Sequence, residues 1–154
     1  MMTSCATCQG KTLRRTTAEV KRHIAGRLFT SRLPAQECVT CGTKYFAGQD
    51  LQGFELAAAL TLATAGVTDP DALKFMRKVT GLSGKEFAEL LGVRPETVSR
   101  WEAGRPAVDR ATYAIIHQLL ADRAGGTTRT ADYLRSLKHP RRLPRRVKID
   151  PRAA

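Results

Sequence analysis

The sequence lacks long apolar runs, and aromatic residues make up only 6% of its 154 residues. Its longest uncharged apolar stretch, Leu56 to Thr68, is shorter than the roughly 20 residues that a bilayer-spanning helix needs. No paired carboxylates, nucleophile–base arrangement or phosphate-binding loop is recognisable, so an enzyme is not expected. We expect a soluble, cytoplasmic protein with no membrane partner.

Acidic residues are also scarce. The chain has 14 aspartates and glutamates but 26 lysines and arginines, which gives a net charge of +12. The excess lies mainly in residues 1–50, which carry +5, and in residues 135–154, which carry +7. This balance favours a polyanion such as nucleic acid as the partner. The three histidines show no spacing that would add a metal ligand: His23, His117 and His139.

Only four cysteines are present, and they form two CxxC pairs: Cys5 with Cys8, and Cys38 with Cys41. Two such turns can close a cage of four thiolates around one structural Zn²⁺ per chain. The alternative is two disulfides, but no apolar signal segment precedes Cys5, which favours a reducing compartment and a metal. Glycine follows each pair, at Gly10 and Gly42, where we expect the chain to leave the metal without a side-chain clash.

The chain is expected to fold as an α+β protein with a four-cysteine module at residues 1–48 and a linker helix at 49–68. Thr16 to Ile24 and Arg27 to Leu33 have strand composition and flank the turn Ala25-Gly26, which predicts a β-hairpin. We expect the hairpin and the later helices to have separate cores.

Residues 69–124 show apolar residues at helical spacing, which predicts four short helices, and a short helix and basic tail follow in residues 125–154. Pro70 and Pro95 suit the first position of a helix. Ser83 and Glu86 form a predicted capping box, and Asp109 is a predicted N-cap.

The segment from Leu82 to Gly104, LSGKEFAELLGVRPETVSRWEAG, resembles the Xre/Cro type of helix-turn-helix, the lambda-repressor-like domain. Together with the two CxxC pairs, the order of motifs over residues 5–121 is similar to that of the MqsA antitoxin family, also described as YgiT-type zinc-finger/helix-turn-helix proteins. The chain departs from the family pattern at Gly84, where many members carry glutamine, and at Arg94, where a capping serine is usual.

The resemblance implies a homodimeric transcriptional regulator that binds a palindromic operator in double-stranded DNA. It also implies an antitoxin that represses its own operon and contacts a cognate toxin through the four-cysteine module. Such a protein would lie at the nucleoid. The alternatives are a regulator without a toxin and an RNA-binding or ribosome-associated zinc protein, for which few aromatic residues are available to stack on bases.

Helix geometry predicts which residues of the second helix of the motif face DNA. If Val98 and Trp101 face the core, steps of about 100° per residue turn Glu96, Ser99 and Arg100 outward. Arg100 can then contact guanine and Glu96 a cytosine amino group; alternatively the two form a salt bridge. The full set of candidate DNA contacts is Lys85, Arg94, Glu96, Thr97, Ser99, Arg100 and Arg105.

The basic tail contains two prolines, lacks apolar periodicity and is expected to be disordered when free. It can add phosphate contacts or enter a minor groove; alternatively it only keeps the protein soluble. Its candidate contacts are Arg141, Arg142, Arg145, Arg146 and Lys148.

Overall fold

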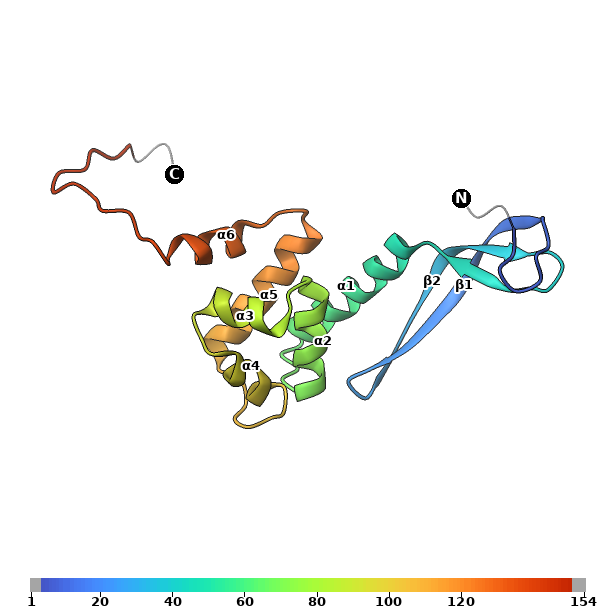
Figure 1. Ribbon diagram of the computed structural model, residues 1–154, viewed down its shortest axis with the longest axis horizontal. Helices are drawn as coiled ribbons and strands as arrows, with labels where there is room; N and C mark the ends of the chain where they lie inside the picture. Colours follow the sequence, from blue (N-terminus) through green and yellow to red (C-terminus); the bar gives the residue numbers. More distant parts are fainter. Residues whose placement is uncertain (1–3, 151–154) are drawn as a thin grey trace.

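The computed structural model describes residues 4–150, which form an antiparallel sheet followed by helices (Figure 1). The α+β class expected from the sequence is confirmed. In Figure 1 the hairpin lies on one side, the helices gather in the middle, and the tail extends away on the far side. Within the described residues no helix is both long and apolar enough to cross a membrane.

The sheet is built on one long hairpin. Strand β1 (Leu13–Ile24) pairs with β2 (Arg27–Cys38) over twelve residue pairs, and β3 (Lys44–Phe46) adds to the far side of β2. Ala25 and Gly26 both have positive φ, 48° and 73°, as a two-residue turn between right-twisted strands requires. The predicted turn is confirmed, whereas β2 runs on beyond Leu33 to Cys38, and the short β3 was not predicted.

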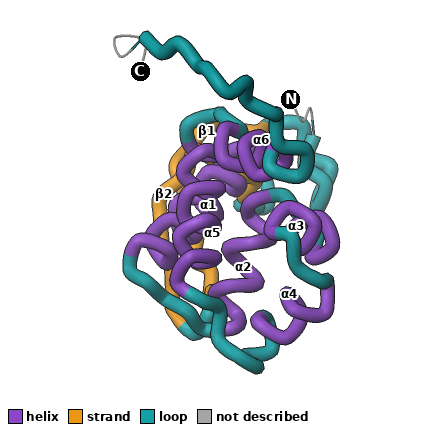
Figure 2. Tube along the Cα trace, turned by 90° about the vertical axis from the view of Figure 1, so that its left-hand side faces the viewer, coloured by secondary structure: helices purple, strands orange, loops and turns teal. Residues whose placement is uncertain are grey.

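The helices follow in the order α1 (Gly48–Thr64), α2 (Pro70–Thr80), α3 (Gly84–Leu91), α4 (Pro95–Trp101), α5 (Arg110–Ala124) and α6 (Arg129–Ser136). The predicted capping box is formed: the Ser83 side chain accepts from the Glu86 amide, and the Glu86 carboxylate accepts from the Ser83 amide. Asp109 accepts a hydrogen bond from the backbone amide of Thr112. Pro70 and Pro95 occupy first helical positions as predicted. Figure 1 and Figure 2 show α2 to α5 gathered together, with α6 beside α3 and α5, while α1 packs on α2 and α5 and extends toward the sheet.

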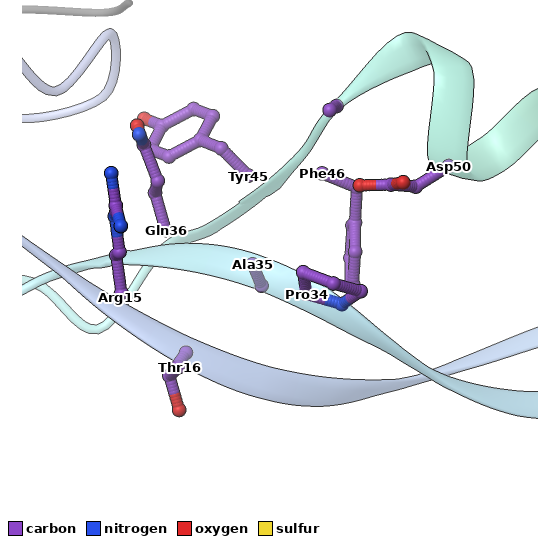
Figure 3. A pocket seen from close by; sticks show the side chains of 9 residues that line it. Arg15, Thr16, Pro34, Ala35, Gln36, Tyr45, Phe46 and Asp50 are labelled. Carbon is purple, nitrogen blue, oxygen red and sulfur yellow. The ribbon is translucent and has the colours of Figure 1, made fainter.

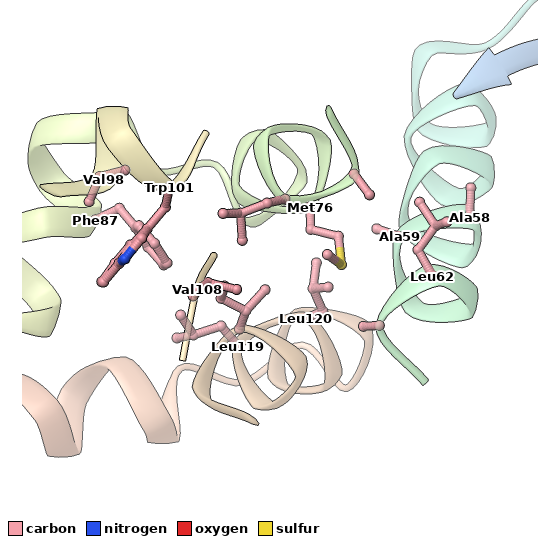
Figure 4. Close-up of a cluster of buried hydrophobic side chains, with 14 of the residues drawn as sticks. Ala58, Ala59, Leu62, Met76, Phe87, Val98, Trp101, Val108, Leu119 and Leu120 are labelled. Carbon is pink, nitrogen blue, oxygen red and sulfur yellow. The ribbon is translucent and has the colours of Figure 1, made fainter. Parts of the chain in front are cut away.

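The main core lies among these helices and includes the fully buried Phe87, Leu62, Leu73, Met76, Ile116 and Leu120 (Figure 4). The structure differs from the expectation of two separate cores, because Ile24 at the hairpin tip belongs to the same buried cluster. Ala25 and Phe29 pack against that cluster as well. The ion pair between Arg27 and Asp69, 2.9 Å long, adds a second link between the tip and the start of α2.

Candidate metal centre and nucleic-acid interface

The two CxxC turns come together at the end of the hairpin that is remote from its tip. All four Sγ atoms lie within 4.8 Å of one another, with 3.5 Å between Cys5 and Cys41 and 3.6 Å between Cys8 and Cys38. A tetrahedral ion with Zn–S bonds of about 2.3 Å would require S···S separations of about 3.8 Å. All four thiols are free rather than joined in disulfides. The cluster therefore has the spacing of a structural metal site.

Both turns share one backbone pattern. The amide of each first cysteine donates to a carbonyl five residues later, from Cys5 to Gly10 and from Cys38 to Thr43, at 2.9 Å in both. The carbonyls of Cys5 and Cys38 in turn accept from the amide four residues later, at 2.8 Å. The cage is thus made of two local copies of the same turn, and these turns bring the four thiols together.

The two glycines after the CxxC pairs have different physical roles. Gly42 adopts a left-handed conformation with φ of 72°, but in the first turn the corresponding residue is Gln9, with φ of 57°. At Gly10 a Cβ atom would lie 2.9 Å from Oγ1 of Thr40, closer than real Cβ contacts come. Gly10 therefore allows the two turns to approach each other, and Gly42 allows the second turn to bend.

Hydroxyl groups surround the thiols. Cys5 and Cys38 are buried, whereas Cys8 and Cys41 are exposed. The hydrogen bond with the Tyr45 hydroxyl, at 3.0 Å, lowers the pKa of the Cys5 thiol to about 5, with further help from the backbone of Cys8 and Thr7. The Thr43 hydroxyl, at 3.1 Å, likewise lowers the pKa of Cys41. The pKa of the Cys8 thiol is raised instead, because the hydrogen bond from the Gly10 amide lowers it less than the neighbouring thiols of Cys41 and Cys38 raise it. The shifts at Cys5 and Cys41 favour the thiolate, which is the form that binds metal.

The second candidate site is the helix-turn-helix of α3 and α4. Gly92 ends α3 in a left-handed conformation, and Arg94 precedes α4 without a side-chain capping hydrogen bond. Val98 and Trp101 are buried, at 2% and 8% exposure. In Figure 4 their side chains gather with Phe87 between the helices. The predicted inward face of α4 is confirmed.

The outward face of α4 is open. Glu96, Ser99 and Arg100 are exposed, while Thr97 is partly buried. Among the ion pairs of residues 4–150 none joins Glu96 to Arg100, so the salt bridge considered as an alternative does not form. The side chains of Glu96 and Arg100 are therefore accessible to a bound ligand.

The other candidate contacts flank α4 in the chain. Lys85 is exposed in the first turn of α3, and Arg94 is exposed just before α4. Arg105 is exposed in the loop after α4, where its amide donates to the carbonyl of Arg100 at 2.8 Å. In the tail, residues 137–150 form neither helix nor strand, and the five candidate contacts there are exposed.

One important ion pair was missed by sequence reasoning. Arg77 of α2 forms a forked ion pair with Glu102, the C-cap residue of α4, and donates to the carbonyl of Leu82 at 2.9 Å. Arg77 follows the buried Leu73 by one helical turn, so its place on the inward face could have signalled the need for a buried partner. The pair fixes the end of α4 against α2.

Comparison with known proteins supports the second site. Residues 73–129 match a family model described as helix-turn-helix. The match runs from within α2 to the first residue of α6 and so contains the whole of α3, α4 and α5. No curated protein shows significant similarity to the chain. The match supports a DNA-binding transcriptional regulator.

Proposed function

We propose that the protein is a sequence-specific DNA-binding transcriptional regulator that reads bases with α4. The observation that carries the proposal is the outward face of α4, where Glu96, Ser99 and Arg100 are exposed above a buried Val98 and Trp101. This face lies within the segment that matches the helix-turn-helix model. A short helix presented in this way fits the major groove.

The candidate residues suit different parts of DNA. Arg100 has the forked guanidinium that can bind O6 and N7 of guanine, and Glu96 can accept from the amino group of cytosine. Ser99 and Thr97 carry hydroxyls that can bind either a base or a phosphate. Lys85, Arg94 and Arg105 suit phosphates, and the basic tail would add further phosphate contacts.

The proposal is tested by selection from a pool of random DNA duplexes with the purified full chain. The expected result is enrichment of one palindromic sequence, because we also propose a homodimer with two-fold symmetry. Light scattering of the free protein and of its complex with the enriched duplex checks the two-chain stoichiometry. Equal affinity for all duplexes would contradict the proposal.

We further propose that the four cysteines hold one structural Zn²⁺ per chain. The S···S separations and the free thiols support this, and four thiolates favour zinc over harder cations. Metal analysis of the purified chain, together with a thiol titration, tests the proposal. About one zinc per chain is expected, and fully reduced protein without metal would contradict it.

The finer proposal is an MqsA-like antitoxin that represses its own operon and contacts a toxin through the four-cysteine module. It is supported by the order of motifs, two CxxC turns before a helix-turn-helix. Co-expression with the adjacent reading frame tests it. A neighbouring protein that arrests growth alone and co-purifies with this chain is expected. A harmless neighbour would favour a regulator without a toxin.

A further inference from the structure

A tyrosine reaches the cysteine cluster from the third strand. Tyr45 lies in the middle of β3, and its hydroxyl oxygen is 3.0 Å from Sγ of Cys5 and 3.4 Å from Oγ1 of Thr7. The pairing of Tyr45 with Gln36 in β2 sets the position of the tyrosine. The contact therefore depends on the folded sheet rather than on neighbours in the chain.

The charge of the proposed cage explains why such a donor is needed. Four thiolates around a divalent cation leave a net charge of two minus, which must be solvated. Cys5 is only 1% exposed, so water has little access to it, and the Tyr45 hydroxyl stands where water would otherwise donate. Cys41, by contrast, is exposed and is within 3.1 Å of the Thr43 hydroxyl.

We propose that Tyr45 is a positioning residue of the metal centre, whose hydroxyl donates a hydrogen bond to the metal-bound thiolate of Cys5. The hydrogen bond orients the buried ligand and strengthens metal binding. It also ties β3 to the cage, although β3 has only three residues and would be a weak strand alone. The inference rests on the proposed zinc centre.

The same tyrosine links the cage to a surface groove. Tyr45 lines a cavity of about 450 Å³ together with Arg15, Gln36, Phe46 and Asp50. In Figure 3 the side chains of Arg15, Gln36 and Tyr45 project from the same side of the sheet. Under this proposal, metal binding would hold one wall of this groove through Tyr45, and metal removal would release it.

The direct test compares Tyr45→Phe with the wild-type chain in competition with a chelator for Zn²⁺. Phenylalanine keeps the ring and removes only the hydroxyl. Loss of such an outer hydrogen bond is expected to weaken metal affinity about 10- to 100-fold. Tyr133→Phe is the matched control, because Tyr133 in α6 is 65% exposed and has no part in the cluster.

A second readout separates a hydrogen bond to sulfur from a packing role. With Co²⁺ in place of Zn²⁺, the thiolate-to-cobalt charge-transfer band of Tyr45→Phe is expected at longer wavelength, because the sulfur lone pair is no longer stabilised. Hydrogen exchange of full-length protein should also become faster at the amides of β3 in this variant, but not in Tyr133→Phe.

A third measurement uses the unaltered sequence and so does not depend on the variant folding. In protein labelled at tyrosine Cζ, addition of Zn²⁺ should shift the resonance of Tyr45 and leave that of Tyr133 unchanged. If the wild-type chain binds no metal, the zinc centre itself is wrong. If it binds zinc but Tyr45→Phe has the same affinity and band, or the Tyr45 resonance does not respond, the role of Tyr45 is overturned.

Discussion

At the scale of single residues, the position of α4 depends on the pair of Arg77 and Glu102. Their side chains are only 9% and 15% exposed, and Arg77 also satisfies the carbonyl of Leu82 between α2 and α3. A buried ion pair contributes little more to the free energy of unfolding than a well-packed apolar pair would. Removing one partner, however, leaves the other as an uncompensated buried charge. The geometry of the whole motif therefore depends on both partners.

Arg77→Met is expected to lower the free energy of unfolding by about 3–5 kcal/mol, because the Glu102 carboxylate would remain buried without a partner. Urea denaturation followed by the fluorescence of Trp101, the single tryptophan, measures this. Arg135→Met is the control, since its ion pair with Asp132 is exposed and should contribute about 0–1 kcal/mol. Similar losses in the two variants would show that the buried pair has no special role.

At the scale of elements, the hairpin joins the metal centre to the helices. At the open end of the hairpin, Cys5 precedes β1 and Cys38 is the last residue of β2. At the tip, Ile24 lies in the helical core. The two faces of the tip differ: Ile24 is 8% exposed, whereas Leu28, on the other face, is 52% exposed. The hairpin thus contributes to the stability of the helices through one side of its tip.

Ile24→Ala is accordingly expected to destabilise the helical core by about 2 kcal/mol, the lower end of the range for buried isoleucine, because the tip can relax. The unfolding transition reported by Trp101 measures the effect in the full chain. Leu28→Ala changes an exposed apolar residue of the same hairpin and should leave that transition within about 0.5 kcal/mol of wild type. An unaltered transition in Ile24→Ala would mean that the tip does not support the core.

At the scale of the whole molecule, local signals in the sequence predicted most of the fold. The Ala25-Gly26 turn, the Ser83 capping box and the prolines at positions 70 and 95 act through a few neighbouring residues and were found correctly. Contacts between distant residues were not predictable in this way. Tyr45 with Cys5, Arg77 with Glu102 and Ile24 with the helical core all depend on how the elements meet.

The uneven charge of the molecule gives a prediction for the tail. Removing residues 139–154 is expected to weaken binding to all duplexes alike. If all five basic candidates contact phosphates, the slope of log affinity against log salt concentration should also become shallower, by up to about 4 to 5. Titrations at several salt concentrations measure the slope. Replacing the exposed Leu143 and Ile149 by serine is the control and should leave it unchanged. An unchanged slope after removal of the tail would assign the tail to solubility.

The central claim is that α4 reads bases through Arg100. The most direct test is to titrate Arg100→Ala against the selected operator and against a scrambled duplex at one salt concentration. We expect a loss of about 1–3 kcal/mol on the operator and a much smaller loss on the scrambled duplex. Arg129→Ala, which removes an exposed arginine at the start of α6, is the control and should bind the operator like wild type. Equal losses of Arg100→Ala on both duplexes, or no loss on either, would contradict the claim.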